Sequence, residues 1–243
     1  MKPKFLAALL LCAAVTIVTT VVTATRTFMT RGQKTVHGVS ETEVDKNRMT
    51  VRRQAKIAKA QGKKKLALPI SSGDYIRVDS IEQAAASRLV VIAEPIRVLS
   101  KLEHGEDSVG SWYKFKSVEI LSEPSYSYSF GNAPAELLPL AENEFVAYFP
   151  GGTLEVEGIQ VESYSPNEPP LLVSSKYLLF LDFDKASRVA RVEFGPDSIF
   201  AVHEDGSVRT INKNTGRLQQ EMRARFDNSI YRVRAGIKKP ASK

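Results

Sequence analysis

The chain has 243 residues, of which 43% are hydrophobic and 25% charged, and its formal net charge is +7. Cys12 is the only cysteine. Once a leader containing Cys12 is removed, disulfides, a thiolate nucleophile and a cysteine-ligated metal are all excluded. A secreted domain without disulfides must be large enough to be held together by its apolar core.

The N-terminal residues have the pattern of a membrane-targeting segment. Lys2 and Lys4 precede an uncharged run over residues 5–25 that is densely apolar as far as Val15. A basic start, an apolar stretch and small side chains at residues 22–24 predict a signal peptide cleaved after Ala24. Residues 5–24 also reach the length of about 20 residues that a retained transmembrane helix requires. We therefore expect an extracytoplasmic protein, secreted or periplasmic, with a single-pass membrane anchor as the alternative.

Charge divides the rest of the chain into unlike parts. Residues 31–65 carry eleven basic and three acidic side chains, a net charge of +8. Residues 66–216 have a net charge of −10, and residues 217–243 a net charge of +6. We predict a signal peptide or anchor over 1–24, a basic and partly helical linker over 25–67 and an all-β domain over 68–216. A basic C-terminal tail follows over 217–243, with a partly helical tail as an alternative. Such asymmetry concerns partners and solubility rather than fold.

The basic linker has some features of a helix. Ser40 and Glu43 form a capping box, and Gly62 is a natural helix stop. The apolar stripe is thin, so we expect a loosely attached helix or a disordered linker. Two interpretations of its cations remain open: contact with an anionic membrane surface or with nucleic acid, for which no specific recognition is predicted, or a solvated spacer. The candidate contact residues, called the basic cluster below, are Arg52, Arg53, Lys56, Lys59, Lys63, Lys64 and Lys65.

From about residue 69 the apolar pattern changes to a period of two, which is typical of strands. We predict strands over 90–92, 112–121, 145–149, 154–161, 177–183, 189–194 and 199–202, with turns at Glu157-Gly158 and Asp205-Gly206. Ser80 is expected to cap one short helix over 81–87. The prediction is a mainly β protein, a single antiparallel barrel or sandwich preceded by an N-terminal hydrophobic helix and the basic linker.

The order of these segments also resembles a known class of proteins. The stretches Leu-Val-Val-Ile-Ala at 89–93, Tyr-Lys-Phe-Lys-Ser-Val-Glu-Ile-Leu at 113–121, Phe-Pro-Gly-Gly-Thr at 149–153 and Lys-Tyr-Leu-Leu-Phe-Leu at 176–181 precede Ile-Phe-Ala-Val-His-Glu-Asp-Gly-Ser-Val at 199–208. Residues 78–210 thereby resemble uncharacterised secreted bacterial proteins with small barrels similar to the oligonucleotide/oligosaccharide-binding (OB) architecture. The chain departs from them at 92–94, where a glycine usually follows the first strand. The resemblance implies a fold and no functional residue.

No catalytic, metal or cofactor motif stands out. His203 followed by Glu204 and Asp205 fits a strand running into a hairpin, and Asp182 and Asp184 lie on one face of a strand without a calcium-loop glycine. A hydrolase would be favoured if His203, Asp182 and Asp184 met in a cleft. No cofactor is predicted.

Two aromatic groups have alternative interpretations. Trp112, Tyr113 and Phe115 are expected in the core, although on an open barrel face they would stack on sugars or bases. Tyr126, Tyr128 and Phe130 alternate with serines and are the better surface candidates. We therefore predict a non-catalytic extracytoplasmic binding module, with a hydrolase or a structural protein of the cell envelope as alternatives.

Overall fold

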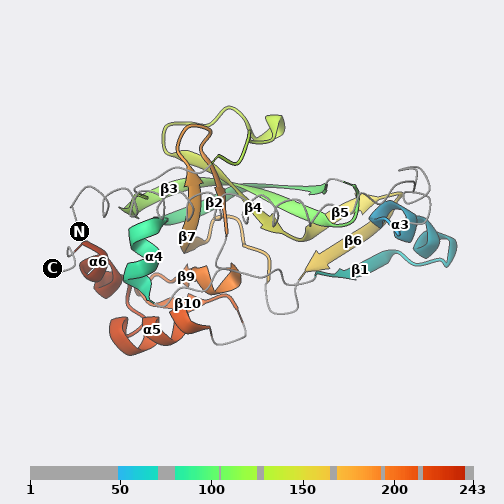
Figure 1. Ribbon diagram of the computed structural model, residues 1–243. Coiled ribbons are helices and arrows are strands. Elements are labelled where there is room, and N and C mark those ends of the chain that lie inside the picture. The colour runs from blue at the N-terminus through green and yellow to red at the C-terminus, as the bar shows by residue number, and fades with distance from the viewer. Residues whose placement is uncertain are drawn as a thin grey trace, which may run out of the picture. The chain divides into compact units, whose positions relative to one another are not determined.

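The computed structural model describes residues 49–70, 80–103, 105–124, 129–164, 169–192, 195–212 and 216–238 (Figure 1). These residues belong to a compact unit that begins at Met49. The predictions of cleavage after Ala24, of the capping box at Ser40 and of the exposed Tyr126 and Tyr128 lie outside the described residues. No helix among the described residues combines the length and the apolar content needed to cross a membrane.

The protein is mainly β, with its described strands in two sheets. The strands of the larger sheet are paired in the order β10-β9-β7-β2-β3-β4-β8, and those of the smaller sheet in the order β1-β6-β5. Their bounds are β1 Lys65–Pro69, β2 Leu89–Leu102, β3 Val109–Ser122, β4 Glu144–Pro150, β5 Gly152–Val156, β6 Ile159–Tyr164, β7 Lys176–Asp184, β8 Val189–Arg191, β9 Ile199–Val202 and β10 Val208–Thr210.

Five strands of the larger sheet form a closed ring. β8 pairs in parallel with β4 on one side and antiparallel with β7 on the other, so the ring runs β2-β3-β4-β8-β7 and back to β2. Aromatic and aliphatic side chains fill the interior, which we call the barrel core. Phe115 stacks on Phe145 at 5.2 Å between ring centroids, and Tyr113 contacts Phe149 edge-on at 5.1 Å. Closure buries these rings, because alternate residues of each strand point inward.

The prediction of a mainly β protein is confirmed, with the strands in two sheets. The predicted single antiparallel barrel or sandwich differs in detail, because the pairs β1–β6 and β4–β8 are parallel. The chain leaves the larger sheet at Gly151 and Gly152. The φ angle of Gly151 is +89°. A Cβ at Gly151 would overlap the Ser163 carbonyl oxygen, and one at Gly152 would overlap the Ser111 hydroxyl. Only glycine permits this close approach, so β5 continues from β4 into a separate sheet.

Helix α3 (Val51–Ala60) covers the smaller sheet. The Thr50 side chain caps it by accepting a hydrogen bond from the Arg53 amide at 3.3 Å. Val51 and Ala55 are fully buried against Val156 and other residues of the smaller sheet and against Val109 at the start of β3. The expected loose attachment is therefore corrected, because small side chains let the helix approach the strands closely. The expected boundary at residue 68 falls inside β1, which pairs with β6.

Helices α4 (Ile81–Ser87), α5 (Arg217–Phe226) and α6 (Ile230–Lys238) lie together at the other end of this unit, beside β7, β9 and β10 (Figure 1). They form a second apolar core with β2 and β7, called the helix-covered core below. The Ser80 cap of α4 is confirmed, with its hydroxyl 3.0 Å from the Gln83 amide. The segment expected to be a basic tail supplies five buried members of this core: Leu218, Met222, Phe226, Ile230 and Val233. The short helix predicted over 81–87 is one of four described α-helices; α3 lies in the linker predicted to be partly helical, and α5 and α6 lie in the predicted C-terminal tail.

Both predicted turns are confirmed. Glu157 and Gly158 have φ of +55° and +77°, as a two-residue hairpin turn between β5 and β6 requires. At the second turn, the Gly206 amide donates to the His203 carbonyl at 3.0 Å and joins β9 to β10. The predicted strand over 154–161 is accordingly two strands separated by the first of these turns.

Candidate binding groove

The barrel is open where β3 extends beyond β4. β3 pairs with β4 from Gly110 to Lys116, and with β2 as far as Ser122. The last link on the β4 side is the Ser117 amide, which donates to the Asn143 carbonyl at 2.8 Å. From there to Ser122, β2 is the only strand of the described chain that pairs with β3. The wall of the barrel therefore has a gap beside this segment.

A groove of about 1130 Å³ occupies this gap. Leu89 and Phe145, both only 3% exposed, belong to the barrel core, and Phe183 packs against that core. The Phe145 and Phe183 rings meet edge-on, with centroids 6.2 Å apart. The floor of the groove is thus the open end of the barrel core. Its lining residues are Leu89, Ser117, Ile120, Glu123, Pro124, Ala141, Glu142, Asn143, Glu144, Phe145, Phe183, Lys185 and Arg188.

Ile120 is an exposed apolar side chain in the wall of this groove. It lies opposite Val91, a member of the barrel core, so both side chains point to the interior side of the sheet. Ile120 nevertheless remains 48% exposed, because the barrel wall is missing there. Val118 of the same strand is equally exposed, at 49%, but does not line the groove. Register shifts between β2 and β3 near these residues place the two side chains differently.

The rim of the groove is charged and mostly paired. Lys185 binds Glu123 at 2.9 Å, and the Arg188 guanidinium donates to the Ala141 carbonyl at 2.6 Å. Glu144 accepts from Lys114 at 2.8 Å, and this hydrogen bond, followed by that from the Ala141 amide, lowers the pKa of Glu144. Among the described ion pairs, none involves the fifth charged lining residue, Glu142, which is exposed.

The turn before β4 is held firmly. The Glu144 amide donates to the Ala141 carbonyl at 3.0 Å, while the Ala141 amide donates to the Glu144 carboxylate at 2.8 Å. From the other side, the Val146 amide donates to the Arg188 carbonyl at 3.0 Å. These bonds fix the rim before any ligand arrives, which reduces the entropy lost on binding.

Asp182 and Asp184 do not form the open pair of oxygens that a calcium site needs. Asp182 is fully buried and forms an ion pair with Arg88, which is also buried. Asp184 accepts hydrogen bonds from the amides of Ala186 and Ser187 at 2.9 and 3.3 Å. Interaction with Ser187, followed by the bond from the Ala186 amide, lowers the pKa of Asp184. Asp184 thus holds the turn between β7 and β8, and Asp182 pairs with Arg88 directly before β2. Among the described residues, no group of three or more potential ligands could hold a metal.

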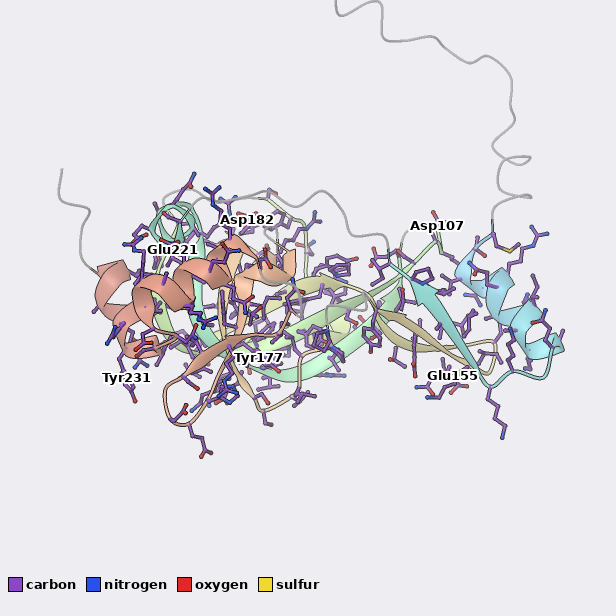
Figure 2. All side chains as sticks on the ribbon, turned by 90° about the horizontal axis from the view of Figure 1, so that it is seen from below. Asp107, Glu155, Tyr177, Asp182, Glu221 and Tyr231 are labelled. Carbon is purple, nitrogen blue, oxygen red and sulfur yellow. The ribbon has the colours of Figure 1, made fainter. Side chains whose placement is uncertain are left out.

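His203 is not placed beside these carboxylates. Val202 pairs with Lys176 at the start of β7, and the exposed His203 lies one residue further on. Asp182 lies near the other end of β7, well separated from Tyr177 (Figure 2). Six residues of strand correspond to about 20 Å. The His203, Asp182 and Asp184 constellation that would have favoured a hydrolase is therefore not assembled.

The basic cluster is partly neutralised by carboxylates. Arg52 binds Glu106 at 2.9 Å and Glu157 at 3.1 Å. Hydrogen bonding to Glu106 is the main cause of the raised pKa of Arg52. Lys59 donates to the Glu157 carbonyl at 2.9 Å, and Lys65 binds Glu162 at 3.1 Å. Lys56 lies 3.9 Å from Glu157, while Arg53, Lys63 and Lys64 are exposed.

The aromatic strand is divided between two faces. Tyr113 and Phe115 are buried in the barrel core, as predicted, and burial raises the pKa of Tyr113 to about 12. Trp112 lies half-buried on the other face, edge-on to Tyr148 at 5.3 Å. The Arg191 guanidinium lies over the Phe130 ring, 4.8 Å from its centroid.

Sequence reasoning did not find the groove. Phe145, Phe183 and Ile120 were recognised only as members of strands, and Glu142 carried no signal. The one local clue was the shift of the apolar alternation along β3 near Val118. No protein-family model matches the chain, and a search of curated proteins gave no significant match.

Proposed function

We propose that the protein is a non-catalytic binding module that holds its ligand in the barrel-mouth groove. The observation that carries this proposal is Ile120, which remains 48% exposed beside a floor made of barrel-core residues. A concave apolar site with a few fixed polar groups is the usual form of a binding pocket. The hydrogen-bonded rim from Ala141 to Glu144 supplies such groups.

The OB-like architecture is part of the same proposal. Its support is the closed ring of five strands with one parallel pair, β4–β8. OB-type barrels are small Greek-key barrels that bind ligands on their strands and loops. The smaller sheet, made of β1 before the barrel and of β5 and β6 between β4 and β7, would then be an addition to this barrel.

An extracytoplasmic location, secreted or periplasmic, completes the proposal, with a membrane-anchored form as its alternative. The support is the basic start and apolar run over residues 2–24. Fractionation and N-terminal sequencing test it: a mature chain starting at residue 25 is expected. A chain that keeps Met1 and requires detergent for extraction would favour the anchor.

The groove is tested with the apolar dye Nile red and the full chain. Ile120→Glu should weaken dye binding at least about tenfold, because a carboxylate placed in an apolar contact loses hydration without gaining a partner. Val118→Glu is the matched control, since the two residues share a strand and an exposure. Equal effects of the two substitutions, or no saturable binding, would refute the groove as the site.

The basic cluster supports a second proposal, contact with an anionic membrane surface. The supporting observation is that Arg53 is exposed in the first turn of α3, and Lys63 and Lys64 are exposed in the segment after its last turn. Each such cation near an anionic surface contributes about 1 kcal/mol. The structure gives no reason for headgroup preference.

Phosphatidylglycerol vesicles test this second proposal. Reversing Lys63 and Lys64 to glutamate should abolish most binding at low salt, whereas reversing the remote Arg209 and Arg223 makes the same change in net charge and should matter less. Binding should disappear near 0.5 M salt, where the screening length is about 4 Å. Binding that survives this salt would contradict an electrostatic contact.

A further inference from the structure

Arg188 lies at the rim of the groove without a counter-charge. The residue is partly buried, and no ion pair among the residues that the structure describes includes it. Its guanidinium Nη1 donates instead to the Ala141 carbonyl oxygen, with the two atoms 2.6 Å apart. Burial takes water away from a charge, so charges in such positions are normally paired. Arg188 therefore favours the approach of an anion to this part of the groove.

The backbone of Arg188 is held in a strained conformation. Its φ is +55°, in the left-handed region that residues other than glycine, asparagine and aspartate seldom adopt. The Arg188 carbonyl accepts from the Val146 amide at 3.0 Å, directly before the first paired residues of β4 and β8. Together with the bond to Ala141, this contact fixes both the backbone and the side chain at the rim. Such strain is found at ligand-binding positions, and a fixed cation loses little entropy when its ligand binds.

The bond to Ala141 leaves one edge of the guanidinium for a ligand. Arginine carries five N–H groups in a planar fork, and the parallel pair on Nε and Nη2 matches the two oxygens of a carboxylate. A carboxylate also brings a single negative charge to a single cation. A phosphate monoester brings about −1.5 to −2 at pH 7 and would be repelled more strongly by Glu142, an exposed acid of the same rim. The rim thus favours a carboxylate over a phosphate.

The apolar surface of the groove determines what the carboxylate is attached to. Leu89, Phe145 and Phe183 form the floor, and Ile120 adds an exposed apolar wall. The side chains of these four residues carry no hydrogen-bonding group. A hydrocarbon chain gains free energy from contact with all of them, because each contact removes apolar surface from water.

We infer that the ligand of the groove is a long-chain carboxylate. Its carboxylate binds Arg188, and its hydrocarbon chain lies on the floor beside Ile120. An amine headgroup at Glu142 is the weaker match, since Glu142 is exposed and hydrated whereas Arg188 is partly buried. This inference rests on the proposed function and names the ligand class of that site.

Four ten-carbon amphiphiles test the headgroup by displacing Nile red from the full chain, each below its micelle concentration. Decanoate should displace the dye at a concentration at least about tenfold lower than decan-1-ol or decylamine, because only the anion forms a charge-assisted bond with Arg188. Decyl phosphate should bind more weakly than decanoate. Octanoate should be weaker than decanoate by about tenfold, since two methylene groups fewer contact the floor.

Substitutions of Arg188 test its role in the same assay. Arg188→Met should abolish the preference for decanoate over decan-1-ol while changing the affinity for Nile red by less than about twofold. Arg188→Lys keeps the charge without the planar fork and should restore part of the preference. Arg209→Met removes the same charge at an exposed position of β10 outside the groove, and this matched control should keep the full preference.

The floor is tested with the pair already used for the dye. Ile120→Glu should weaken decanoate binding at least about tenfold, and Val118→Glu should not. An equal loss from both substitutions would contradict a hydrocarbon chain lying beside Ile120.

The outcomes separate this inference from the proposed function. Nile red binding that depends on Ile120, with no preference for decanoate or with a preference that survives Arg188→Met, would overturn the carboxylate and leave the groove as a binding site. Tighter binding of decylamine or decyl phosphate than of decanoate would have the same meaning. Absence of saturable binding of both the dye and the amphiphiles would overturn both proposals.

Discussion

Helix α3 and the helices α5 and α6 are both taken from strongly basic segments, yet they are attached to the protein in different ways. α3 buries Val51, Ala55 and Ala58 against the smaller sheet. α5 and α6 bury larger side chains, including Met222 and Phe226, in the helix-covered core. Because apolar stabilisation grows with the area removed from water, the C-terminal helices are part of the core and α3 is a lighter attachment.

Backbone pairing strengthens the same contrast. The Ile230 amide donates to the Gly206 carbonyl at 3.0 Å, and the Val208 amide donates to the Asn228 carbonyl at 2.7 Å. These bonds tie the C-terminal helices to the β9–β10 hairpin. At α3, the Val51 amide donates to the Glu106 carbonyl at 2.7 Å, and the other described links outside the helix are mainly exposed ion pairs. Net charge therefore does not distinguish a solvated segment from one that belongs to the core.

The largest expected effect on thermal unfolding follows removal of the C-terminal helices α5 and α6, or of α3. A chain truncated after residue 215 should lose cooperative thermal unfolding, because the helix-covered core loses five buried side chains. A chain beginning at residue 65 lacks α3 and should keep a cooperative transition at a lower temperature. Circular dichroism melts compare the two. Similar melting of both chains would show that the two regions contribute alike.

Single substitutions sharpen the comparison. Phe226→Ala should lower the free energy of unfolding by about 3–5 kcal/mol, as expected when a buried aromatic side chain leaves a cavity. Val51→Ala should cost about 1–2 kcal/mol, since it removes two buried methyl groups. Urea unfolding of the full chain measures both. Equal costs would mean that α3 is packed as firmly as α5.

Acid should detach α3 before the rest of the protein unfolds. The hydrogen bond from Arg52 lowers the pKa of Glu106; at Glu82 burial raises the pKa, but the bonds from Arg225 and other donors outweigh it. Both pKa values are lower in the folded protein than in the unfolded chain. The ionised carboxylates of Glu106 and Glu82 therefore stabilise the fold fully above about pH 5, and this stabilisation is lost as pH falls through the folded pKa values. Hydrogen exchange should show α3 opening first. Simultaneous opening of α3 and α5 would contradict this order.

The smallest effects on stability are expected from substituting the arginines that form the ion pairs of α3 and α5, Arg52 and Arg225. Arg52→Ala and Arg225→Ala should each change the melting temperature little, because both side chains are about half exposed. Arg225→Ala should have the larger effect, since its partner Glu221 is mostly buried and also accepts from the Ile81 amide at the start of α4. A larger effect from Arg52 would reverse the ranking of the two regions.

Local patterns predicted much of the fold. The strands of the ring, the Ser80 cap and both hairpin turns follow from alternation, capping chemistry and glycine placement, which act within a few residues. The candidate site was not predictable in this way. Ile120, Phe183 and Glu142 come together only through strand pairing, and nothing local says that β4 begins too late to cover the end of β3.

The sequence by itself determined the apolar leader pattern, the charge asymmetry and the predominance of strands, because composition and short-range periodicity suffice for these. Only the tertiary structure decided that the basic segments at 51–60 and 217–238 are packed helices, since a few small or widely spaced apolar residues acquire meaning when a matching surface lies opposite them. It likewise decided where the barrel opens, because a gap in a sheet depends on which strands end first.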